Sequence, residues 1–333
     1  GSLSATYPLY TGGKLRNALK IAKTQLDLAL EKERNVRQKL TYNVKSTFNQ
    51  VWLAKEQLLV ANAAYENMTR HAERIEKLYN VGNTSKFELL RAQVNRDNLK
   101  PAVIKAQNGV ATAKLALATL IGLPKDSSFE IAFNPDQVSL PEKPAGTLDN
   151  ALNLAFQNRS ELKQLKLAAE INEIQVALAE AYLKPNVAIT GSYEGTGTEL
   201  DPGSWDKSWS LTLGVKGNLF SGTNKPQVEL AKAELEKTKI QEAYLKDGIR
   251  QEVEQVFLAI KESLETTKSA QANISLAKEA LRLTEVRFQA GMATTIDVMD
   301  AQLAQDQALT DYYGSLAAYL TALAKLDLVT GQN

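Results

Sequence analysis

The chain has 333 residues, with 39 basic residues, 38 acidic residues and no cysteine. The balanced charge excludes the polybasic surface of a nucleic-acid-binding protein, so we expect no nucleic-acid partner. The missing cysteine excludes a disulfide framework and a thiolate metal site. No apolar run approaches the ~20 residues of a membrane-spanning helix, and no signal-peptide pattern is present. We expect Gly1-Ser2 to be an expression remnant, with the natural amino terminus removed.

The first part of the chain predicts a strand followed by a very long helix. Residues 3–10 alternate, which places Leu3, Ala5, Tyr7 and Leu9 on one face, and the Thr11-Gly12-Gly13 segment forms a turn. The following helix extends from about residue 14 to residue 80 without glycine or proline. At 1.5 Å per residue such a helix is roughly 100 Å long, far longer than a globular average of about 12 residues.

A break and a returning helix follow. Gly82 begins a four-residue break that ends in Ser85, a candidate N-cap with Glu88 three residues later. The returning helix is expected over residues 86–121, with a kink at Pro101. Residues 123–147 contain four prolines and predict an irregular connector.

The second part predicts a helix over 149–183, ended by Pro185, and strands over 186–193 and 208–219 around a Gly/Asp/Pro loop. The Ser221-Gly222-Thr223-Asn224 segment resembles the first turn, and Pro226 fits the start of a second long helix that reaches about residue 289. Gly291 ends that helix, and a last helix is expected over 295–329.

The carboxyl half repeats the amino half at an offset of 209 residues, so that Gly82, Asp97, Leu117 and Gly122 return as Gly291, Asp306, Leu326 and Gly331. A heptad series of seam positions repeats in the same register: Val44, Val51, Leu58, Tyr65, Ala72 and Tyr79 in the first copy, and Val253, Ile260, Thr267, Ile274, Leu281 and Phe288 in the second. A seven-residue apolar period produces a left-handed coiled coil. We therefore predict a mainly α fold of long antiparallel coiled-coil helices in two tandem repeats with short β-strands, divided into a first repeat (1–124), an equatorial connector (125–148) and a second repeat (149–333).

Signals for catalysis are almost absent. The single histidine, His71, stands beside Arg70 and close to Glu73, which favours a solvated surface position. No nucleophile elbow, P-loop or metal-spaced cluster appears, and Gly12-Gly13 lacks the Lys-Ser/Thr of a phosphate-binding loop. We expect no enzymatic activity, no cofactor and no metal.

The strands carry a different signal. In the strand over 208–219, Trp209, Leu211, Leu213 and Val215 share one face, and Ser208, Ser210, Thr212 and Lys216 share the other. Transmembrane barrel strands of ~9–11 residues show this alternation. A soluble hairpin packed on a helix shows it as well, with one face on a core.

Acidic residues follow both glycine breaks: Glu88 after Gly82, and Asp297 and Asp300 after Gly291. Acids in the first turn of a helix favour its positive dipole end, so Glu88 and Asp297 could be ordinary helix-start residues. Asp300 lies one turn further in and is harder to explain in this way.

Together these segments resemble the TolC family of outer-membrane efflux and secretion channels over nearly the whole chain. The resemblance rests on the order and duplication of four kinds of segment. These are the strand–turn–helix junctions (Leu9 to Gly13 and Leu219 to Gly222), the tips (Tyr79 to Gly82 and Phe288 to Gly291), the segments that follow them (Phe87 to Ala92 and Ile296 to Ala301), and the helix ends (Leu120 to Gly122 and Leu328 to Gly331).

The resemblance implies a passive homotrimeric duct for small-molecule efflux or type I protein secretion in the bacterial outer membrane, with a long periplasmic extension. Each protomer would add strands to a 12-stranded barrel in outer-membrane lipid. An adaptor and an inner-membrane pump would open its tips, with Asp297, Asp300 and Glu88 at the pore entrance. The adaptor would contact the tips, at Gly82, Thr84, Ser85, Gly291, Thr294 and Thr295.

Two departures from the family pattern lie at the second tip. Ala293 stands where some members carry an arginine that ties the closed tip, and Phe288 replaces a tyrosine. The family's first helix and first strand are also missing before Leu3, so only three barrel strands are visible. A periplasmic adaptor and a soluble coiled-coil scaffold remain as rival classes. The sequence has no lipoyl-like flanks that would indicate an adaptor, and a scaffold needs no apolar strand face.

Overall fold

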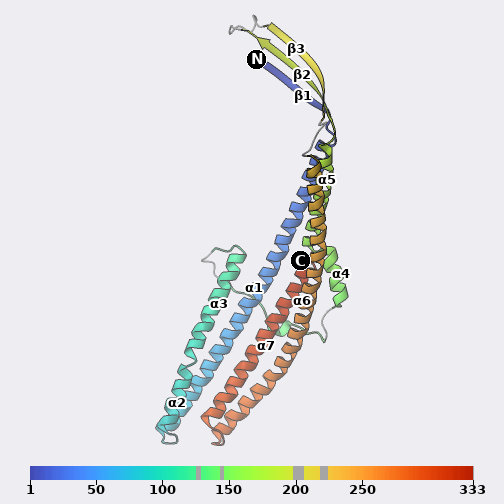
Figure 1. Ribbon diagram of the computed structural model, residues 1–333. Helices are drawn as coiled ribbons and strands as arrows, with labels where there is room; N and C mark the ends of the chain where they lie inside the picture. Colours follow the sequence, from blue (N-terminus) through green and yellow to red (C-terminus); the bar gives the residue numbers. More distant parts are fainter. Residues whose placement is uncertain (125–128, 143–145, 198–205, 218–223, 333) are drawn as a thin grey trace. The chain divides into compact units, whose positions relative to one another are not determined.

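The structure is a computed structural model and describes residues 1–124, 129–142, 146–197, 206–217 and 224–332. Its two long helices are α1 (Lys14–Asn80) and α6 (Asn224–Gln289), and each is continuous. The other elements are the strands β1 (Ser2–Tyr10), β2 (Asn186–Thr196) and β3 (Asp206–Lys216), the helices α2 (Lys86–Asp97), α3 (Lys100–Leu120), α4 (Leu148–Asn158), α5 (Ser160–Ala181) and α7 (Thr295–Val329), and a short 3₁₀ helix at Pro135–Gln137 (Figure 1). The predicted mainly α fold with short strands is confirmed.

The chain divides into two compact units that do not follow the order of the sequence. The first comprises residues 1–36 and 159–248, and the second comprises residues 37–158 and 249–333. Each unit therefore contains parts of both sequence repeats, because α1 and α6 each contribute to both. The division into repeats at 1–124 and 149–333 stays a prediction about the origin of the chain.

In the first unit the strands form an antiparallel sheet in the order β1-β2-β3. Its base is held by the turn after β1, where Gly12 has a φ of +64° and lies so close to α5 that a Cβ there would be 2.9 Å from the carbonyl oxygen of Ala181. Lys14 donates from Nζ to Asn186 Oδ1 (3.2 Å) and lies over the ring of Tyr182. The predicted turn at 11–13 therefore joins the sheet to the helices of this unit.

In the second unit the heptad seam forms the core. Val51, Val253 and Ile260 are no more than 2% exposed, as predicted for seam positions. The prediction is wrong for Tyr79, the last position of the first series, which is 37% exposed beside the tip. The seam residue Thr267 and the nearby Ser263 are also buried, and both satisfy their hydroxyl groups within α6. Ser263 Oγ donates to the carbonyl of Ala259 (2.7 Å), and Thr267 Oγ1 donates to that of Ser263 (2.6 Å). These bonds let polar side chains lie on the seam without an unsatisfied donor.

Two predicted helices are each divided in the structure. The helix expected over 86–121 is α2 and α3, because Pro101 at the start of α3 has no N–H to donate to the carbonyl of Asp97. The helix expected over 149–183 is α4 and α5, separated by Arg159 in extended conformation. No glycine or proline marks this second break. A tertiary contact at the end of α4 accompanies it: Gly331 approaches Asn158 so closely that a Cβ would lie 2.8 Å from the carbonyl carbon of Asn158.

The described part of the connector is irregular, as predicted, apart from the 3₁₀ turn. Phe133 packs edge-on against Trp52 of α1, with ring centroids 4.9 Å apart. Glu130 accepts hydrogen bonds from Lys114 of α3 and Lys55 of α1, which hold the pKa of its carboxyl group down to about 2. The connector thus joins α1 to α3 through one carboxylate.

Candidate functional site

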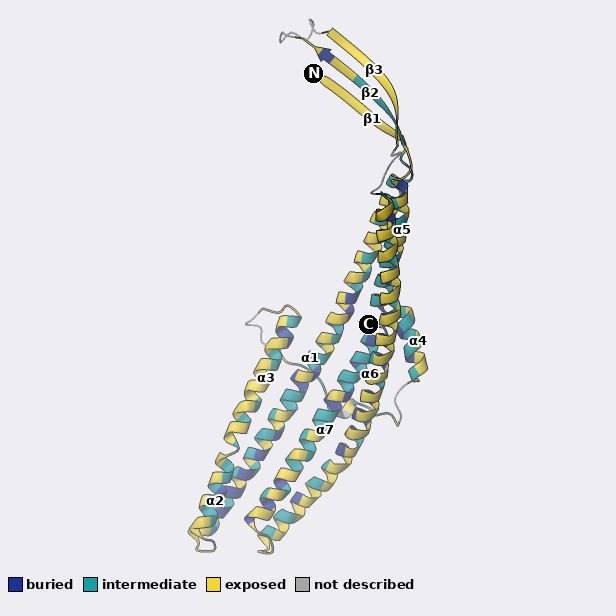
Figure 2. Ribbon diagram, viewed as in Figure 1, coloured by how far each residue is buried: buried dark blue, intermediate teal, exposed yellow. Residues whose placement is uncertain are grey.

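The sheet has one apolar face that extends across all three strands. The register pairs Tyr193 with Trp209, Ile189 with Leu213, and Val187 with Val215, and β1 adds Leu3 opposite Tyr193 and Tyr7 opposite Ile189. The side chains of Trp209, Leu211, Leu213 and Val215 are 79%, 66%, 64% and 69% exposed. Figure 2 shows β1 and β3 exposed along their whole length. No described part of the chain covers this face, and an exposed apolar patch of this kind marks an interaction surface.

The opposite face is polar and bonded across the strands. Thr6 and Thr190 join hydroxyl to hydroxyl at 3.1 Å, and Ser192 and Ser210 at 2.8 Å. A bulge between Pro8 and Tyr10 makes Leu9 the extra residue of β1, so that Tyr10 pairs with Val187. The predicted facing of Leu9 stays a prediction. The predicted Leu219 to Gly222 junction lies outside the described residues.

The first hairpin tip joins α1 to α2. Gly82 has a φ of +78°, and Asn83 donates its N–H to the carbonyl of Leu78 (2.8 Å), which closes the end of α1. Ser85 is the N-cap of α2, and its Oγ accepts from the N–H of Glu88 (3.2 Å). The predicted cap is confirmed.

The second tip joins α6 to α7 and is capped more completely. Gly291 has a φ of +72°. Thr294 Oγ1 accepts from the N–H of Asp297 (3.3 Å), and Asp297 Oδ2 accepts from the backbone N–H of Thr294 (2.6 Å). This reciprocal capping box stabilises the charged carboxylate. Hydrogen bonds from the backbone N–H and the hydroxyl of Thr294 are the main causes that lower the pKa of Asp297, and the nearby positive charge of Arg287 lowers it further.

The predicted tip residues differ in exposure. Asp300 and Asp297 are exposed, Glu88 is half-buried and Thr295 is 4% exposed. Of the other predicted contact residues, Gly82, Ser85, Gly291 and Thr294 are exposed and Thr84 is half-buried. The Thr295 side chain is thus not open to a partner in this chain. Exposed apolar residues that the sequence analysis did not single out stand beside both tips: Val81, Phe87, Leu90, Val94 and Met292.

Above the tips, a chain of hydrogen bonds links the two hairpins. Asn67 of α1 donates to Gln302 Oε1 of α7 (2.9 Å), and Gln302 Nε2 donates to Asp306 Oδ1 (2.8 Å). Arg70 donates to Asn67 at the other end. Burial raises the pKa of Asp306 to about 6, and the bond from Gln302 opposes this only in part. In the sequence Asp306 stands out only as the counterpart of Asp97, and the pattern does not predict this network.

The prediction of a solvated surface position for His71 is wrong. Its side chain is 5% exposed, and its ring centroid lies 5.0 Å from that of Phe288 on α6. The sequence contained a usable signal: His71 stands three residues after Met68 and four before Ile75, both buried, and therefore lies on the seam side of α1. The charged neighbours Arg70 and Glu73 concealed this position.

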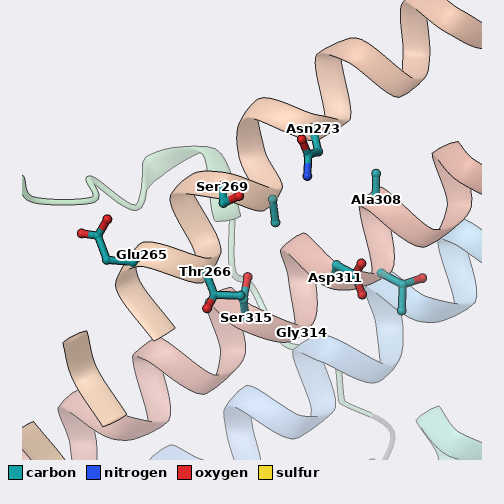
Figure 3. Close-up of a pocket in the computed structure, with 10 residues that line it drawn as sticks. Glu265, Thr266, Ser269, Asn273, Ala308, Asp311, Gly314 and Ser315 are labelled. Carbon is teal, nitrogen blue, oxygen red and sulfur yellow. The ribbon is translucent and has the colours of Figure 1, made fainter. Parts of the chain in front are cut away.

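A groove between α6 and α7 is lined by small and polar residues, among them Ser269, Asn273, Gly314 and Ser315 (Figure 3). It contains none of the predicted site residues. Within the described residues no group of three or more His, Cys, Asp or Glu side chains could hold a metal ion. None of the described helices has both the length and the apolar character for a transmembrane span.

Comparison with known proteins places this geometry in a family. The chain is 21% identical over 301 residues to the outer membrane efflux protein BepC of Brucella suis, covering 88% of this chain and 63% of BepC. It is 26% identical over 337 residues to the pyoverdine export outer membrane protein OpmQ of Pseudomonas putida, covering 96% of this chain and 69% of OpmQ. The crystal structure of the outer membrane protein VceC from Vibrio cholerae has a similar fold, with a TM-score of 0.83, 18% identity and coverage of 99% of this chain and 79% of that one.

The chain thus spans less than two thirds of the length of BepC. The family model described as "Outer membrane efflux protein" matches residues 1–123 and 151–332, which is most of the chain. The chain therefore belongs to the outer membrane efflux protein family.

Proposed function

We propose that the chain is the core of a passive, homotrimeric exit duct of the bacterial outer membrane, which exports small molecules or secreted protein and performs no chemistry itself. The observation that carries this proposal is the family match over both hairpins and all three strands. A second observation supports it: the family's two working parts, an apolar-faced sheet and coiled-coil hairpins, occur in one chain.

The sheet supports a position in lipid. Its apolar face extends over three strands and is exposed in the protomer, and its polar face carries hydroxyl groups bonded across the strands. This is the division expected of barrel strands, with lipid outside and an aqueous lumen inside. We therefore assign Trp209, Leu211, Leu213 and Val215 to the lipid-facing side of a trimeric barrel.

The tips support a gate and a docking region. In a trimer, Asp297 and Asp300 would supply acidic rings that favour cations in a narrow pore, with Glu88 of the first tip nearby. The exposed tip residues Gly82, Ser85, Gly291 and Thr294, with the half-buried Thr84, would contact a periplasmic adaptor that engages an inner-membrane pump. Thr295, being buried, would support the tip rather than touch the adaptor.

The two rival classes fit less well. The match to the outer membrane efflux protein family over both hairpins favours the duct over a periplasmic adaptor. In a soluble coiled-coil scaffold the apolar face of the sheet would be exposed to water, which is unfavourable.

The decisive experiment measures membrane insertion of the chain by flotation with liposomes and its oligomeric state in detergent. We expect a trimer that requires detergent. Leu213→Arg places a charge on the apolar face and should oppose insertion by about 2–4 kcal/mol near the bilayer midplane. The matched control is Thr212→Arg, one residue away on the polar face, which should insert normally. A monomer that stays soluble without detergent, or equal insertion of both variants, would contradict the proposal.

The gate is tested separately by channel conductance in planar bilayers. Asp297→Ala/Asp300→Ala should weaken both cation selectivity and block by a trivalent cation. Unchanged selectivity and block would mean that the two aspartates are helix-start residues only. For Asp297 the capping box is already a sufficient structural role.

A further inference from the structure

His71 is the only histidine in the chain, and it lies where the two hairpins meet. It belongs to α1, two and a half turns before the first tip, and its ring lies against Phe288, the second-last residue of α6. Among the protein's side chains, imidazole alone has an unperturbed pKa that puts its charge change between about pH 5 and 8. A charge change at this point acts directly on the contact between the hairpins.

The surroundings of the ring are apolar. Ala72, Ile75 and Ala92 form a buried cluster here, and Leu78, Leu89 and Phe288 pack against it. Nε2 of His71 is buried and has no hydrogen-bond partner among the described residues. A neutral imidazole can place its unprotonated nitrogen there. A protonated ring would have a second N–H donor without an acceptor, and a charge withdrawn from water.

The charged groups around the ring come from three helices. Burial lowers the pKa of His71 most strongly, Arg74 on its own helix lowers it further, and Glu88 on α2 opposes both. On α6, Arg287 precedes Phe288 and is exposed. The environment therefore favours the neutral ring as long as the hairpins are in contact.

We propose that His71 makes the contact between the two hairpins sensitive to pH: the neutral ring holds the end of α6 against α1, and protonation separates them. The separated state is favoured in acid because it lets the charged ring reach water. This inference concerns the contact itself and does not depend on export, so its test reads a distance and not transport.

The direction follows from linkage. A base whose pKa in the folded contact is lowered stabilises that contact above its ordinary pKa of 6.5 and loses this contribution as the pH falls through the lowered value. Asp306 in the neighbouring network acts in the opposite sense, because its raised pKa removes stability as the pH rises towards about 6. The two groups are therefore distinguishable by the sign of their effect.

The chain has no cysteine, so a pair of spin labels can be placed without background. Lys77→Cys on α1 and Gln289→Cys on α6 are exposed positions near the contact. In the full chain we expect the distance between the labels to lengthen from about pH 8 to about pH 5. His71→Phe, which stays uncharged and can still pack on Phe288, should abolish the change. His71→Gln, which has an uncharged polar side chain, should also abolish the change and serves as a second variant if phenylalanine disturbs the packing.

Two charge variants sharpen the assignment. Glu88→Gln removes the group that supports the charged ring and should shift the transition to lower pH, whereas Arg74→Gln should shift it to higher pH. Asp306→Asn should leave the acid-induced lengthening in place. An unchanged distance in the labelled parent chain would overturn the proposal, and so would an equal lengthening in the His71→Phe and His71→Gln variants.

Discussion

The two returning helices start from equivalent tips but differ in continuity. At the offset of 209 residues, Ser85 corresponds to Thr294, Glu88 to Asp297 and Pro101 to Thr310. The first return is divided into α2 and α3 just before Pro101, whereas α7 continues for 35 residues through Thr310. Thr310 keeps its backbone N–H, and its Oγ1 donates to the carbonyl of Asp306 (2.8 Å). One residue thus decides whether a repeated segment is one helix or two.

This difference in continuity affects which side-chain hydrogen bonds each returning helix can form. The unbroken α7 carries Gln302 and Asp306 one turn apart on the same face, and this spacing allows the Asn67–Gln302–Asp306 chain of bonds. In the first repeat the counterpart of Asp306 is Asp97, the last residue of α2, whose carboxylate instead pairs with the adjacent Arg96. The two tips are alike, whereas among the described residues the chain of bonds from Asn67 to Asp306 has no counterpart at Asp97.

The largest expected effect compares the two seams. Ile260 on the second seam is 2% exposed, whereas Leu58 on the first seam, one heptad after Val51, is half-buried. Ile260→Asp should destabilise the chain by at least about 3 kcal/mol, because it buries an unpaired charge. Leu58→Asp should cost roughly half of that, since its carboxylate can reach water. Denaturant unfolding in detergent measures both, and equal losses would show that the difference in burial between Ile260 and Leu58 does not set the cost.

The next test exchanges the residues that distinguish the returns. Thr310→Pro removes one hydrogen bond from the middle of α7 and should cost about 3 kcal/mol. It should also raise amide exchange around residue 306. Pro101→Thr should instead lower exchange at Asn98 and Leu99 and change stability by less than about 1 kcal/mol. If α7 tolerates proline without increased exchange, the break between α2 and α3 has a cause other than Pro101.

These comparisons also separate what sequence reasoning can reach from what it cannot. The bounds of α1 were predictable because a long heptad series without glycine or proline ends at Gly82, which needs a positive φ. The division at Arg159 was not, because it coincides with the approach of Gly331, a contact between residues far apart in the chain. The raised pKa of Asp306 also depends on its burial in the folded chain. The tip acids could be named from the sequence, but their exposure and their bonds could not.

A smaller effect concerns the network that only the second return carries. The raised pKa of Asp306 means that its ionisation opposes folding as the pH rises from the ordinary value of 3.8 through about 6. Asp306→Asn should therefore stabilise the chain at pH 8 by about 1–2 kcal/mol. The gain should disappear at about pH 4, where the wild-type carboxyl group is largely protonated. Unfolding curves at the two pH values measure the difference, and a gain that is equal at both would indicate that the fold does not raise the pKa of Asp306.

The smallest effect compares the caps of the two tips. Ser85 accepts one bond at the start of α2, whereas Thr294 and Asp297 cap each other at the start of α7. Replacing an N-cap residue by alanine costs about 1 kcal/mol. Thr294→Ala should exceed Ser85→Ala because it also removes the hydroxyl bond to the Asp297 carboxylate. The pKa of Asp297 should then rise only part of the way towards its ordinary value, because the backbone N–H of residue 294, which is the largest cause of the lowered pKa, remains and only the hydroxyl bond is lost. The lowered pKa of Asp297 stabilises the wild-type chain above pH 3.8, and this stability is lost as the solution becomes more acidic. Thr294→Ala should lack part of this contribution. Equal losses for the two alanine variants would mean that the reciprocal bonds at the second tip add nothing to the single bond at the first.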